Sequence, residues 1–387
     1  MKILIVRGFA SEINISNYNS QEIGLAKALT NKGYTCDIVY YTNCKKAYIQ
    51  ELNVGENIIK IYWYPAIKMF NNAIYTQMIK DKILDNYDII QTNEYNQFMT
   101  WYICKYIKKP IILYNGIYQD SKNLLARIIN NKIPEILFKK TVINNVNIAI
   151  GKSKLAENYL KNKGFKNTDT IGVGLDIEKL NNAYKKSENI YKIIENLKVK
   201  LNDNKVLLYV GRLNDKAKNI NFLIDVLESI VKVKPNYKLL LVGKSDEITI
   251  QSYLNYAKTK GIEDNIIHIN GIPQAYIKDI YNMSDIFVLP SKYEIFGMVI
   301  MESMYFKIPV ITSINGGSTT IIDNKKDGFI IDNFDSELWG KSIINILENK
   351  LYYDEISERA HIKISSNFTW DSLADKFINI YNQIKNS

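Results

Sequence analysis

Short apolar runs recur along the chain, and most of them are followed by a stretch with helical periodicity. In the first half the runs lie at residues 2–6, 37–41, 88–90, 110–113 and 147–150. Runs of this length are typical of buried strands, and the stretches at 20–32 and 95–107 are typical of helices. This alternation predicts a parallel sheet with crossover helices.

The alternation starts again after a polar segment, with apolar runs at residues 205–210, 238–242, 265–269, 285–289 and 308–311. We therefore predict an α/β protein with two Rossmann-like, doubly wound parallel-sheet domains that face a central cleft. Residues 174–203 are rich in Asn and Lys and lack strand runs, so they are the predicted linker. The two domains are then residues 1–173 and 204–366.

A final amphipathic helix is predicted at about residues 370–385, with Thr369 or Asp371 as its N-cap. We expect this helix to pack back on the N-terminal domain. The total of 387 residues exceeds what one hydrophobic core usually organises, which agrees with two domains.

The N-terminal sequence, the lack of a long apolar run and the cysteines predict a protein that stays inside the cell. The chain enters a strand directly, without the pattern of a secretory signal, and no run of 18 apolar residues predicts a membrane span. The three cysteines Cys36, Cys44 and Cys104 are too few and too irregular for a disulfide framework or a Cys-based zinc site. We expect a cytoplasmic protein.

The net charge of +10 belongs entirely to the first 175 residues. Basic and apolar residues alternate at 121–132 and 135–140, which include Arg127, Lys139 and Lys140. Such a pattern favours peripheral attachment to an anionic membrane surface. The alternative is an ordinary solvated helix face. Nucleic-acid binding is not indicated, because no module of interleaved basic and aromatic residues is present.

Ligands of doubly wound sheets bind beyond the carboxyl ends of the strands, so the loops that follow the apolar runs are candidate sites. The richest loop spans residues 291–304, where Gly297 precedes an apolar helix. Free N–H groups at such a helix start attract phosphate. Glu294 lies before the helix and Glu302 lies among apolar residues, where an unpartnered carboxylate would be costly. The alternative is a solvated acidic pair.

A second loop places Gly211, Arg212 and Lys218 after the strand at 205–210. Arginine binds phosphate oxygens through its planar fork, and lysine binds them as a point charge. These two cations and the helix start at Gly297 would together neutralise a diphosphate. Two further strand ends, at Gly243 and at Gly271 with Ile272, fit the same site, although each glycine alone is better explained by a turn.

These residues give the chain a specific resemblance to glycosyltransferase family 4, the group 1 transferases with the GT-B architecture. The resemblance covers nearly the whole second half and the general plan of the first. It is carried by the following motifs: Gly211-Arg212-Leu213 with Lys218-Asn219, Glu294 and Glu302 with Phe296-Gly297 between them, Pro309-Val310, Gly316-Gly317, Ser153, Gly174-Leu175-Asp176 and Phe368-Thr369-Trp370.

The resemblance implies a retaining transferase that moves a hexose or N-acetylhexosamine from a nucleotide-diphosphate sugar, with UDP in preference to GDP. Arg212 and Lys218 would hold the diphosphate, Glu302 the ribose and Glu294 the transferred sugar. The backbone would contribute further donor contacts at Phe296, Gly297, Met298, Val299, Gly211, Gly243 and Ile272. No metal or other cofactor is implied. The acceptor would be a saccharide or a membrane-associated molecule in surface polysaccharide, glycolipid or glycoprotein synthesis.

The chain also departs from the family pattern. The loop that contains Gly8 lacks the usual pair of glycines, so its expected contact with the donor is the least supported. The family often has a histidine where this chain has Asn115, which can hydrogen-bond an acceptor hydroxyl but cannot take a proton. Lys218 is one residue further from Arg212 than is common, which leaves Lys216 as an alternative.

Two other functions are alternatives that these residues do not favour: the Glu294 and Glu302 pair does not specially indicate the first, and the intact site set argues against the second. A sugar-nucleotide epimerase or a phosphorylase has a similar architecture, and an epimerase would change the donor sugar without any acceptor. A non-catalytic protein could bind a nucleotide sugar or a membrane in support of another transferase. Loss of product on replacement of Glu294 would argue against this second alternative.

Overall fold

The computed structural model describes residues 1–15, 20–69, 71–120, 123–181 and 187–385. Its contacts divide the chain into two compact units. The first unit comprises Met1–Gly174 together with Thr369–Ser387, and the second comprises Leu175–Phe368. Residues 121 and 122, which belong to the predicted basic segment 121–132, lie outside the described residues.

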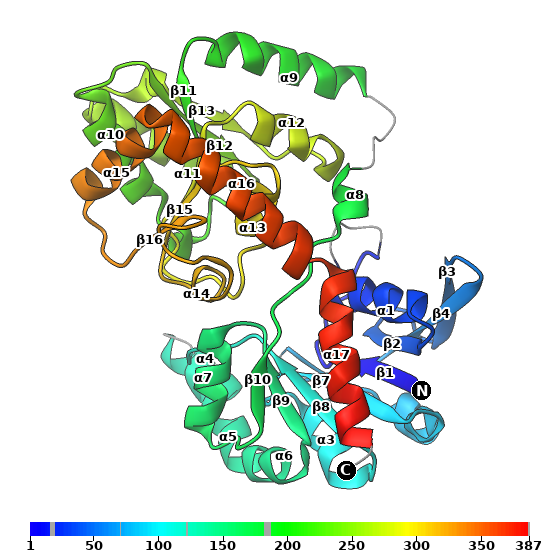
Figure 1. Cartoon of the computed structure of the whole chain (residues 1–387). Coiled ribbons are helices and arrows are strands. Elements are labelled where there is room, and N and C mark those ends of the chain that lie inside the picture. The colour runs from blue at the N-terminus through cyan, green and yellow to red at the C-terminus, as the bar shows by residue number, and fades with distance from the viewer. Residues whose placement is uncertain (16–19, 70, 121–122, 182–186, 386–387) are drawn as a thin grey trace. The chain divides into compact units, whose positions relative to one another are not determined.

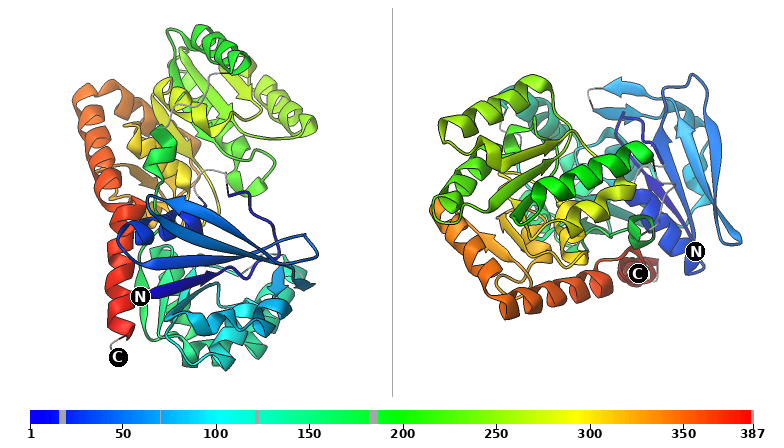
Figure 2. Two further views of the ribbon diagram at one scale, coloured as in Figure 1. Left: turned by 90° about the vertical axis from the view of Figure 1, so that its right-hand side faces the viewer. Right: turned by 90° about the horizontal axis from the view of Figure 1, so that it is seen from above.

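The first unit is built on an eight-stranded sheet in the order β10-β9-β8-β7-β1-β2-β4-β3. All neighbouring pairs are parallel except β3 and β4, which form an antiparallel hairpin at one edge (Figure 2). The strands are β1 (Lys2–Val6), β2 (Thr35–Tyr41), β3 (Tyr48–Val54), β4 (Asn57–Tyr64), β7 (Ile89–Asn93), β8 (Ile111–Asn115), β9 (Ile148–Gly151) and β10 (Thr168–Thr170). A separate small hairpin joins β5 (Ile67–Met69) to β6 (Asn72–Ile74).

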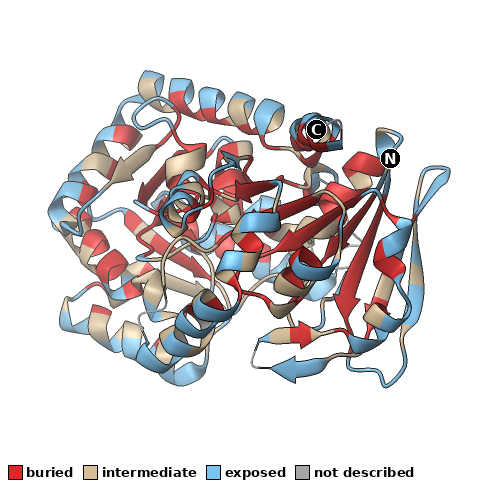
Figure 3. Ribbon diagram, turned by 90° about the horizontal axis from the view of Figure 1, so that it is seen from below, coloured by how far each residue is buried: buried red, intermediate tan, exposed pale blue. Residues whose placement is uncertain are grey.

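Helices cover this sheet, and the central strands are therefore buried on both faces (Figure 3). Residues 3–6 of β1 have no exposed surface, which explains why this strand is a continuous apolar run. The helices of the unit are α1 (Gln21–Asn31), α2 (Thr76–Lys80), η1 (Ile83–Asn86), α3 (Phe98–Tyr106), α4 (Leu124–Arg127), η2 (Ile128–Lys132), α5 (Ile133–Leu137), α6 (Lys139–Asn145), α7 (Lys154–Lys163) and α17 (Trp370–Lys385).

The second unit contains a six-stranded, fully parallel sheet in the order β13-β12-β11-β14-β15-β16. Its strands are β11 (Lys205–Val210), β12 (Tyr237–Val242), β13 (Ile266–Ile269), β14 (Ile286–Leu289), β15 (Val310–Ser313) and β16 (Phe329–Ile331). Numbered along the chain this is the Rossmann order 3-2-1-4-5-6. The predicted fold class, two doubly wound parallel sheets, is confirmed.

The helices of the second unit are α8 (Ile177–Asn181), α9 (Glu188–Leu201), η3 (Lys216–Lys218), α10 (Ile220–Val231), α11 (Glu247–Thr259), η4 (Glu263–Asn265), η5 (Gln274–Tyr276), α12 (Ile277–Asn282), α13 (Met298–Tyr305), α14 (Ser318–Ile321), α15 (Ser336–Glu348) and α16 (Lys350–Asn367) (Figure 1). Two of them, α8 and α9, occupy most of the segment 174–203 that we predicted to be a linker. In α9 the buried residues are Ile194, Leu197 and Leu201, which share one helix face. Its Asn- and Lys-rich outer face hid this helix in the sequence.

Helix α17 packs on the first unit, beside α1, although it follows the second unit in sequence. Trp370 is its anchor, because the ring fills space that side chains at Gly24 and Gly174 would occupy. A Cβ at Gly24 would lie 2.1 Å from the indole nitrogen, and one at Gly174 would lie 2.5 Å from the ring. Further along the helix, the hydroxyl of Tyr381 donates to Gln91 Oε1 at 2.8 Å.

Candidate functional site

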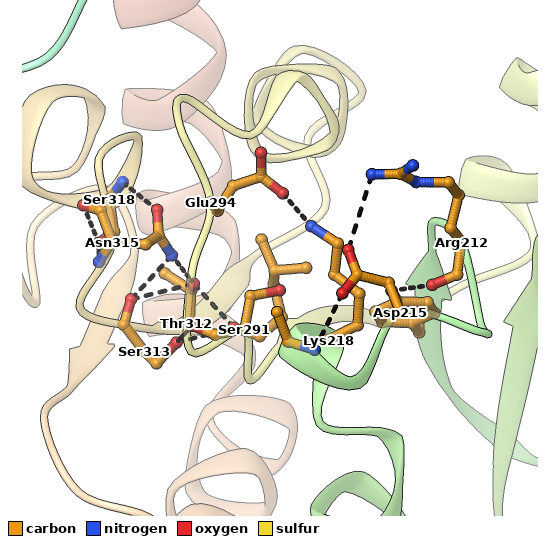
Figure 4. A network of polar contacts seen from close by, with 12 residues as sticks. Arg212, Asp215, Lys218, Ser291, Glu294, Thr312, Ser313, Asn315 and Ser318 are labelled. Atoms are coloured by element: carbon orange, nitrogen blue, oxygen red, sulfur yellow. Dashed lines mark hydrogen bonds and ion pairs between the residues drawn. The ribbon is translucent and has the colours of Figure 1, made fainter. Parts of the chain in front are cut away.

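In each sheet the strand order reverses at one point, and the loops that leave the two strands on either side of that point are where ligands of such sheets bind. In the second unit these strands are β11 and β14. Arg212 and Lys218 follow β11, and Glu294 follows β14. The topology therefore brings the two richest loops of the sequence to one position, which is drawn in Figure 4.

Lys218 and Glu294 form an ion pair in which the lysine Nζ lies 2.5 Å from the glutamate Oε2. Both side chains are largely buried, with 11% and 21% of their surface exposed. A hydrogen bond between charged groups is stronger than one between neutral groups, and partial burial weakens its screening by solvent. The pair holds an ammonium group and a carboxylate beyond the carboxyl ends of β11 and β14.

The backbone around Lys218 explains why this lysine, and not Lys216, reaches Glu294. The Asp215 side chain caps the short helix η3 by accepting from Ala217 N at 3.0 Å, and Ala217 O accepts from Lys292 N at 2.7 Å. The second of these bonds ties the loop after β11 to the loop after β14. Lys216 is exposed on the same short helix. Of the two lysines that the sequence left as alternatives, Lys218 is therefore the one that contacts the Glu294 carboxylate.

Arg212 is far more exposed than Lys218, with 77% of its side-chain surface accessible. Its Nη2 lies 3.6 Å from Asp215 Oδ2, a separation that contributes little at an exposed site. The guanidinium is therefore held only loosely on the same loop as Lys218.

The glycine pair Gly316-Gly317 fixes the backbone that carries Glu294. A Cβ at Gly316 would lie 2.0 Å from Ile295 O, and one at Gly317 would lie 1.6 Å from Phe296 O. Gly316 N also donates to Glu294 O at 3.0 Å. Only residues without a side chain allow the two chain segments to approach this closely.

A buried network of polar side chains holds the glycine pair in place (Figure 4). Asn315 Nδ2 donates to Thr312 Oγ1, and Asn315 Oδ1 accepts from Ser318 N at 2.9 Å. Ser313 Oγ donates to Ser291 O at 2.6 Å, which links the end of β15 to the loop after β14. These hydrogen bonds fix the position of the loop that carries the Glu294 carboxylate.

Helix α13 begins beside this loop, with Gly297 as its N-cap in the left-handed region at φ +73°. Phe296 is buried directly before the cap, and Met298 and Val299 are half-buried in the first turn. Backbone N–H groups at the start of a helix generally lack an i→i−4 partner, although in this turn Ile300 N donates to Gly297 O at 2.9 Å. The geometry is that of a helix start adjacent to the Lys218 and Glu294 pair.

Glu302 lies one turn further along α13 and is almost completely buried, with 4% of its surface exposed. The hydroxyl of Tyr281, on α12, donates to Glu302 Oε2 at 3.0 Å. This bond supplies the partner that a carboxylate among apolar neighbours requires. Nothing in the local sequence identified Tyr281, because the two residues lie 21 positions apart on different helices.

The remaining predicted residues of this unit, Gly211, Gly243 and Ile272, lie after three consecutive strands of the same sheet. Gly243 has a packing reason of its own, since a Cβ there would lie 1.7 Å from Gly211 O. The carbonyl of Gly243 also lies 3.2 Å from Nε2 of His268. The contact of these glycines with a donor stays a prediction.

In the first unit the corresponding reversal of strand order lies between β1 and β7. Gly8 follows β1, and a Cβ there would lie 3.1 Å from the side chain of Gln97, which follows β7. The described chain offers no hydrogen-bond partner to the buried atoms Gln97 Oε1 and Asn93 Oδ1. Asn93 Nδ2 donates to Glu22 Oε1 at 2.9 Å, and Arg7 Nε lies 4.0 Å from the same oxygen.

Glu94 is a buried carboxylate at this edge, in a left-handed backbone conformation with φ +54°. Its two oxygens accept from the backbone N–H groups of Gly116 and Ile117, at 2.9 and 3.3 Å. Burial raises the pKa of the Glu94 carboxyl, although the charge of Lys152 and the two N–H donors act in the opposite direction. The carboxylate thereby fixes the loop after β8.

Asn115, the predicted acceptor-side residue, is fully buried in that same loop. Its Nδ2 donates to Ile117 O at 2.8 Å, and its Oδ1 accepts weakly from Tyr95 N at 3.5 Å. The side chain is therefore committed to its own loop, and a contact with an acceptor hydroxyl stays a prediction that requires this loop to open. The sequence did not single out Glu94 or Gln97, although both follow a predicted strand. Within the described residues, no group of three His, Cys, Asp or Glu side chains is placed to hold a metal ion.

Residues 192–363 match the family model described as glycosyl transferases group 1. An uncharacterised glycosyltransferase of Methanocaldococcus jannaschii is 30% identical over 182 residues, which are 46% of this chain and 45% of that protein. The mannosylfructose-phosphate synthase of Agrobacterium fabrum is 31% identical over 182 residues, which are 46% of this chain and 40% of that protein. The aligned part spans about half or less of each curated relative's length.

Solved structures resemble nearly the whole chain. Sucrose-phosphate synthase from Thermosynechococcus elongatus has a TM-score of 0.74 and 19% identity, and 99% of both chains is covered. HepE of Anabaena, solved in complex with UDP, has a TM-score of 0.73 and 16% identity, with 99% of this chain and all of that chain covered. At these identities the likeness shows the fold alone, which is GT-B, as we predicted.

Proposed function

Because residues 192–363 match the family model of the group 1 glycosyl transferases, we propose that the chain is a retaining glycosyltransferase whose donor is a nucleotide-diphosphate sugar. The observation that carries the proposal is the partly buried ion pair of Lys218 and Glu294 at the strand-order reversal of the second unit. In this pair a cation that can bind a diphosphate lies next to a carboxylate that can accept from a sugar hydroxyl, which supports the proposal.

In this proposal the diphosphate binds to Lys218, Arg212 and the N-terminus of α13. Lys218 keeps its bond to Glu294 and offers its remaining N–H donors to phosphate oxygens. The exposed, loosely held Arg212 turns onto the diphosphate with its planar fork. These groups neutralise the leaving diphosphate as its negative charge develops, which is the charge stabilisation that a metal ion provides in other enzymes.

The two glutamates bind the two ends of the donor. Glu302, fixed by Tyr281, accepts from the ribose hydroxyls, and Glu294 accepts from hydroxyls of the transferred hexose or N-acetylhexosamine. UDP is the preferred nucleotide in this proposal, because HepE, with the same fold, was solved with UDP and with UDP-glucose.

The acceptor hydroxyl attacks the anomeric carbon on the face from which the diphosphate leaves. One bond forms between the acceptor oxygen and that carbon, the bond from the carbon to the diphosphate oxygen breaks, and the hydroxyl proton passes to a phosphate oxygen. The anomeric configuration is thereby retained. The buried acceptors Gln97 Oε1 and Asn93 Oδ1 in the first unit are suited to hydroxyl groups of a saccharide acceptor.

We place the reaction in the cytoplasm, at the inner face of the cell membrane, with a saccharide or lipid-linked acceptor of surface polysaccharide, glycolipid or glycoprotein synthesis. The excess of basic residues in the first unit supports this placement. None of the described helices is both long enough and apolar enough to cross a membrane.

The test is incubation of the protein with a panel of UDP- and GDP-sugars, with and without saccharide acceptors. We expect nucleotide release that depends on the acceptor, and a glycoside whose anomeric configuration, read by NMR, matches that of the donor. Glu294→Gln should lower the rate about 100-fold, as loss of a single electrostatic contact to a transition state does. The control is Glu337→Gln, a glutamate that is 75% exposed on α15.

Two outcomes would contradict the proposal. Conversion of the donor sugar to its epimer without an acceptor would show an epimerase. Nucleotide binding without turnover of any donor in the panel would show a non-catalytic binding protein.

A further inference from the structure

Six exposed apolar side chains gather on three consecutive short helices of the first unit, α4, η2 and α5. They are Leu124, Leu125, Ile128, Ile133, Ile136 and Leu137, and we call them the apolar stripe. Leu125 is 70% exposed and Ile136 is 82% exposed. No other stretch of similar length in the described chain exposes as many large apolar side chains. Contiguous exposed apolar surface marks an interaction site.

The spacing of the stripe shows that its members share one side of the segment. Its members form two series in which the residues are four or eight positions apart. The first series is Leu124, Ile128 and Ile136. The second is Leu125, Ile133 and Leu137. An α-helix of 3.6 residues per turn would slowly rotate a four-residue repeat away from one side. The wider turn of the π-helix η2, with its i→i+5 bonds, offsets this rotation.

The opposite side of the segment is fixed to the unit, so the stripe is not an unanchored helix. Phe138 is buried, and the buried Asn131 donates to Asp120 Oδ1 at 3.2 Å. Lys163, on α7, forms ion pairs with Glu135 and with Asp120. These contacts hold the segment in the orientation that exposes the apolar side chains.

Basic residues accompany the stripe and no free acidic group opposes them. Arg127, Lys132, Lys139 and Lys140 lie within or next to the three helices. The one acidic residue of the segment, Glu135, is paired with Lys163. Apolar side chains flanked by lysine and arginine match the chemistry of a bilayer that contains anionic lipid.

One further feature lies beside the stripe. Ile136, Lys139, Lys140 and Ile143 line a shallow groove of about 360 Å³, together with Asn144 and with Glu135, which is paired with Lys163. The lysines and isoleucines of this groove suit a lipid phosphate and its acyl chain.

We propose that the apolar stripe, with the basic residues beside it, is the surface by which the first unit docks on a bilayer that contains anionic lipid. The leucines and isoleucines enter the boundary between headgroups and acyl chains, and the lysines contact lipid phosphates. This surface would bring the protein to the membrane-associated acceptor of the proposed function, and the inference rests on the proposed function for that acceptor. Docking itself needs neither donor nor acceptor.

The test is co-sedimentation of the full chain with vesicles of phosphatidylcholine alone, or of phosphatidylcholine and phosphatidylglycerol in equal parts. We expect binding to the mixed vesicles, weakened by salt, and little binding to phosphatidylcholine. Leu125→Ser with Ile136→Ser should abolish it. Lys139→Gln with Lys140→Gln should weaken it about 25-fold, from about fivefold for each lysine. The control is Ile248→Ser with Leu351→Ser, two side chains of the second unit that are each 84% exposed.

Absence of binding to the mixed vesicles, or equal loss in the control variant, would overturn the proposal and leave a protein partner for the stripe. Circular dichroism would establish that each variant is folded. A failure of the proposed transfer reaction would leave vesicle binding unchanged, so the two proposals can fail separately.

Discussion

Lys218 and Glu294 are 76 residues apart in the sequence, and yet their charged atoms lie 2.5 Å apart. The reason is topological, because β11 and β14 are neighbours in the sheet and each residue belongs to the loop that leaves one of these strands. The pair is also the point at which the loops after three strands converge, since Gly316, after β15, donates its N–H to Glu294 O.

The contact of Gly317 with Phe296 O predicts that Gly317→Ala will disturb the site. A methyl group there would lie 1.6 Å from the carbonyl oxygen, so the loop that carries Glu294 must move. A displacement of about 1 Å at a reacting centre can lower a rate about 100-fold. We expect a loss of that size in donor turnover, measured as nucleotide release.

The control for this variant is Gly328→Ala in the same unit. Its nearest neighbour would be a methyl group of Ile322 at 3.2 Å, which belongs to a flexible side chain that can give way. Full activity in Gly317→Ala, or an equal loss in both variants, would show that the close backbone approach does not position Glu294.

The packing of Trp370 between Gly24 and Gly174 predicts that α17 stabilises the first unit. Trp370→Ala should lower the free energy of unfolding by about 3–5 kcal/mol, as buried tryptophans generally do. Asp371→Asn removes only a 3.1 Å ion pair with Lys32 at a 74% exposed carboxylate, so it should cost less than about 1 kcal/mol. Urea unfolding followed by circular dichroism measures both. Similar losses in the two variants would mean that the indole ring is not the anchor.

The buried Glu94 predicts a pH-dependent contribution to stability. Burial raises the pKa of its carboxyl above the ordinary value of 4.5, so the folded state resists ionisation more than the unfolded chain does. The free-energy cost of ionising the buried carboxyl is absent below pH 4.5. It grows as the pH rises toward the pKa of the folded state, and it is complete above that pKa. Stability from this group is therefore lost with rising pH.

Glu94→Gln removes the charge, and with it the pH-dependent part of the cost. The free energy of unfolding of the variant, relative to the native chain, should therefore rise from below pH 4.5 to neutral pH. Loss of one bond to the backbone N–H groups adds a penalty that does not depend on pH. Urea unfolding at several pH values measures the difference, with the exposed Glu51→Gln as the control. A difference that is constant or falls with pH would contradict the account.

The sequence predicted the strands of both sheets well where they are continuous apolar runs. The run at 205–210 is β11 itself, and the run at 285–289 contains β14. The inner positions of these strands are covered on both faces and are therefore apolar. The strands β3 and β4, whose hairpin ends the sheet with β3 at its edge, were not predicted, because their exposed positions interrupt the apolar pattern.

The candidate site was predicted only where its residues follow a strand or carry a family motif. Arg212, Lys218, Glu294 and Glu302 met these conditions. Tyr281 did not, because a tyrosine within a helix gives no local sign that it faces a carboxylate. Glu94 is held by the backbone of Gly116 and Ile117, and only the pairing of β7 with β8 brings them together.

The central claim is that the loops of Lys218 and Glu294 bind the diphosphate of a nucleotide sugar. Thermal unfolding with UDP, GDP, ADP and CDP tests it most directly, in the native chain, Lys218→Met and Lys216→Met. UDP at about 100 times its dissociation constant should stabilise the native chain by about 2.7 kcal/mol. Lys218→Met should weaken UDP binding about 10- to 100-fold, as loss of one charged hydrogen bond does, and the exposed Lys216→Met should leave it unchanged. Stabilisation by none of the four nucleotides, or an equal effect of the two substitutions, would contradict the account.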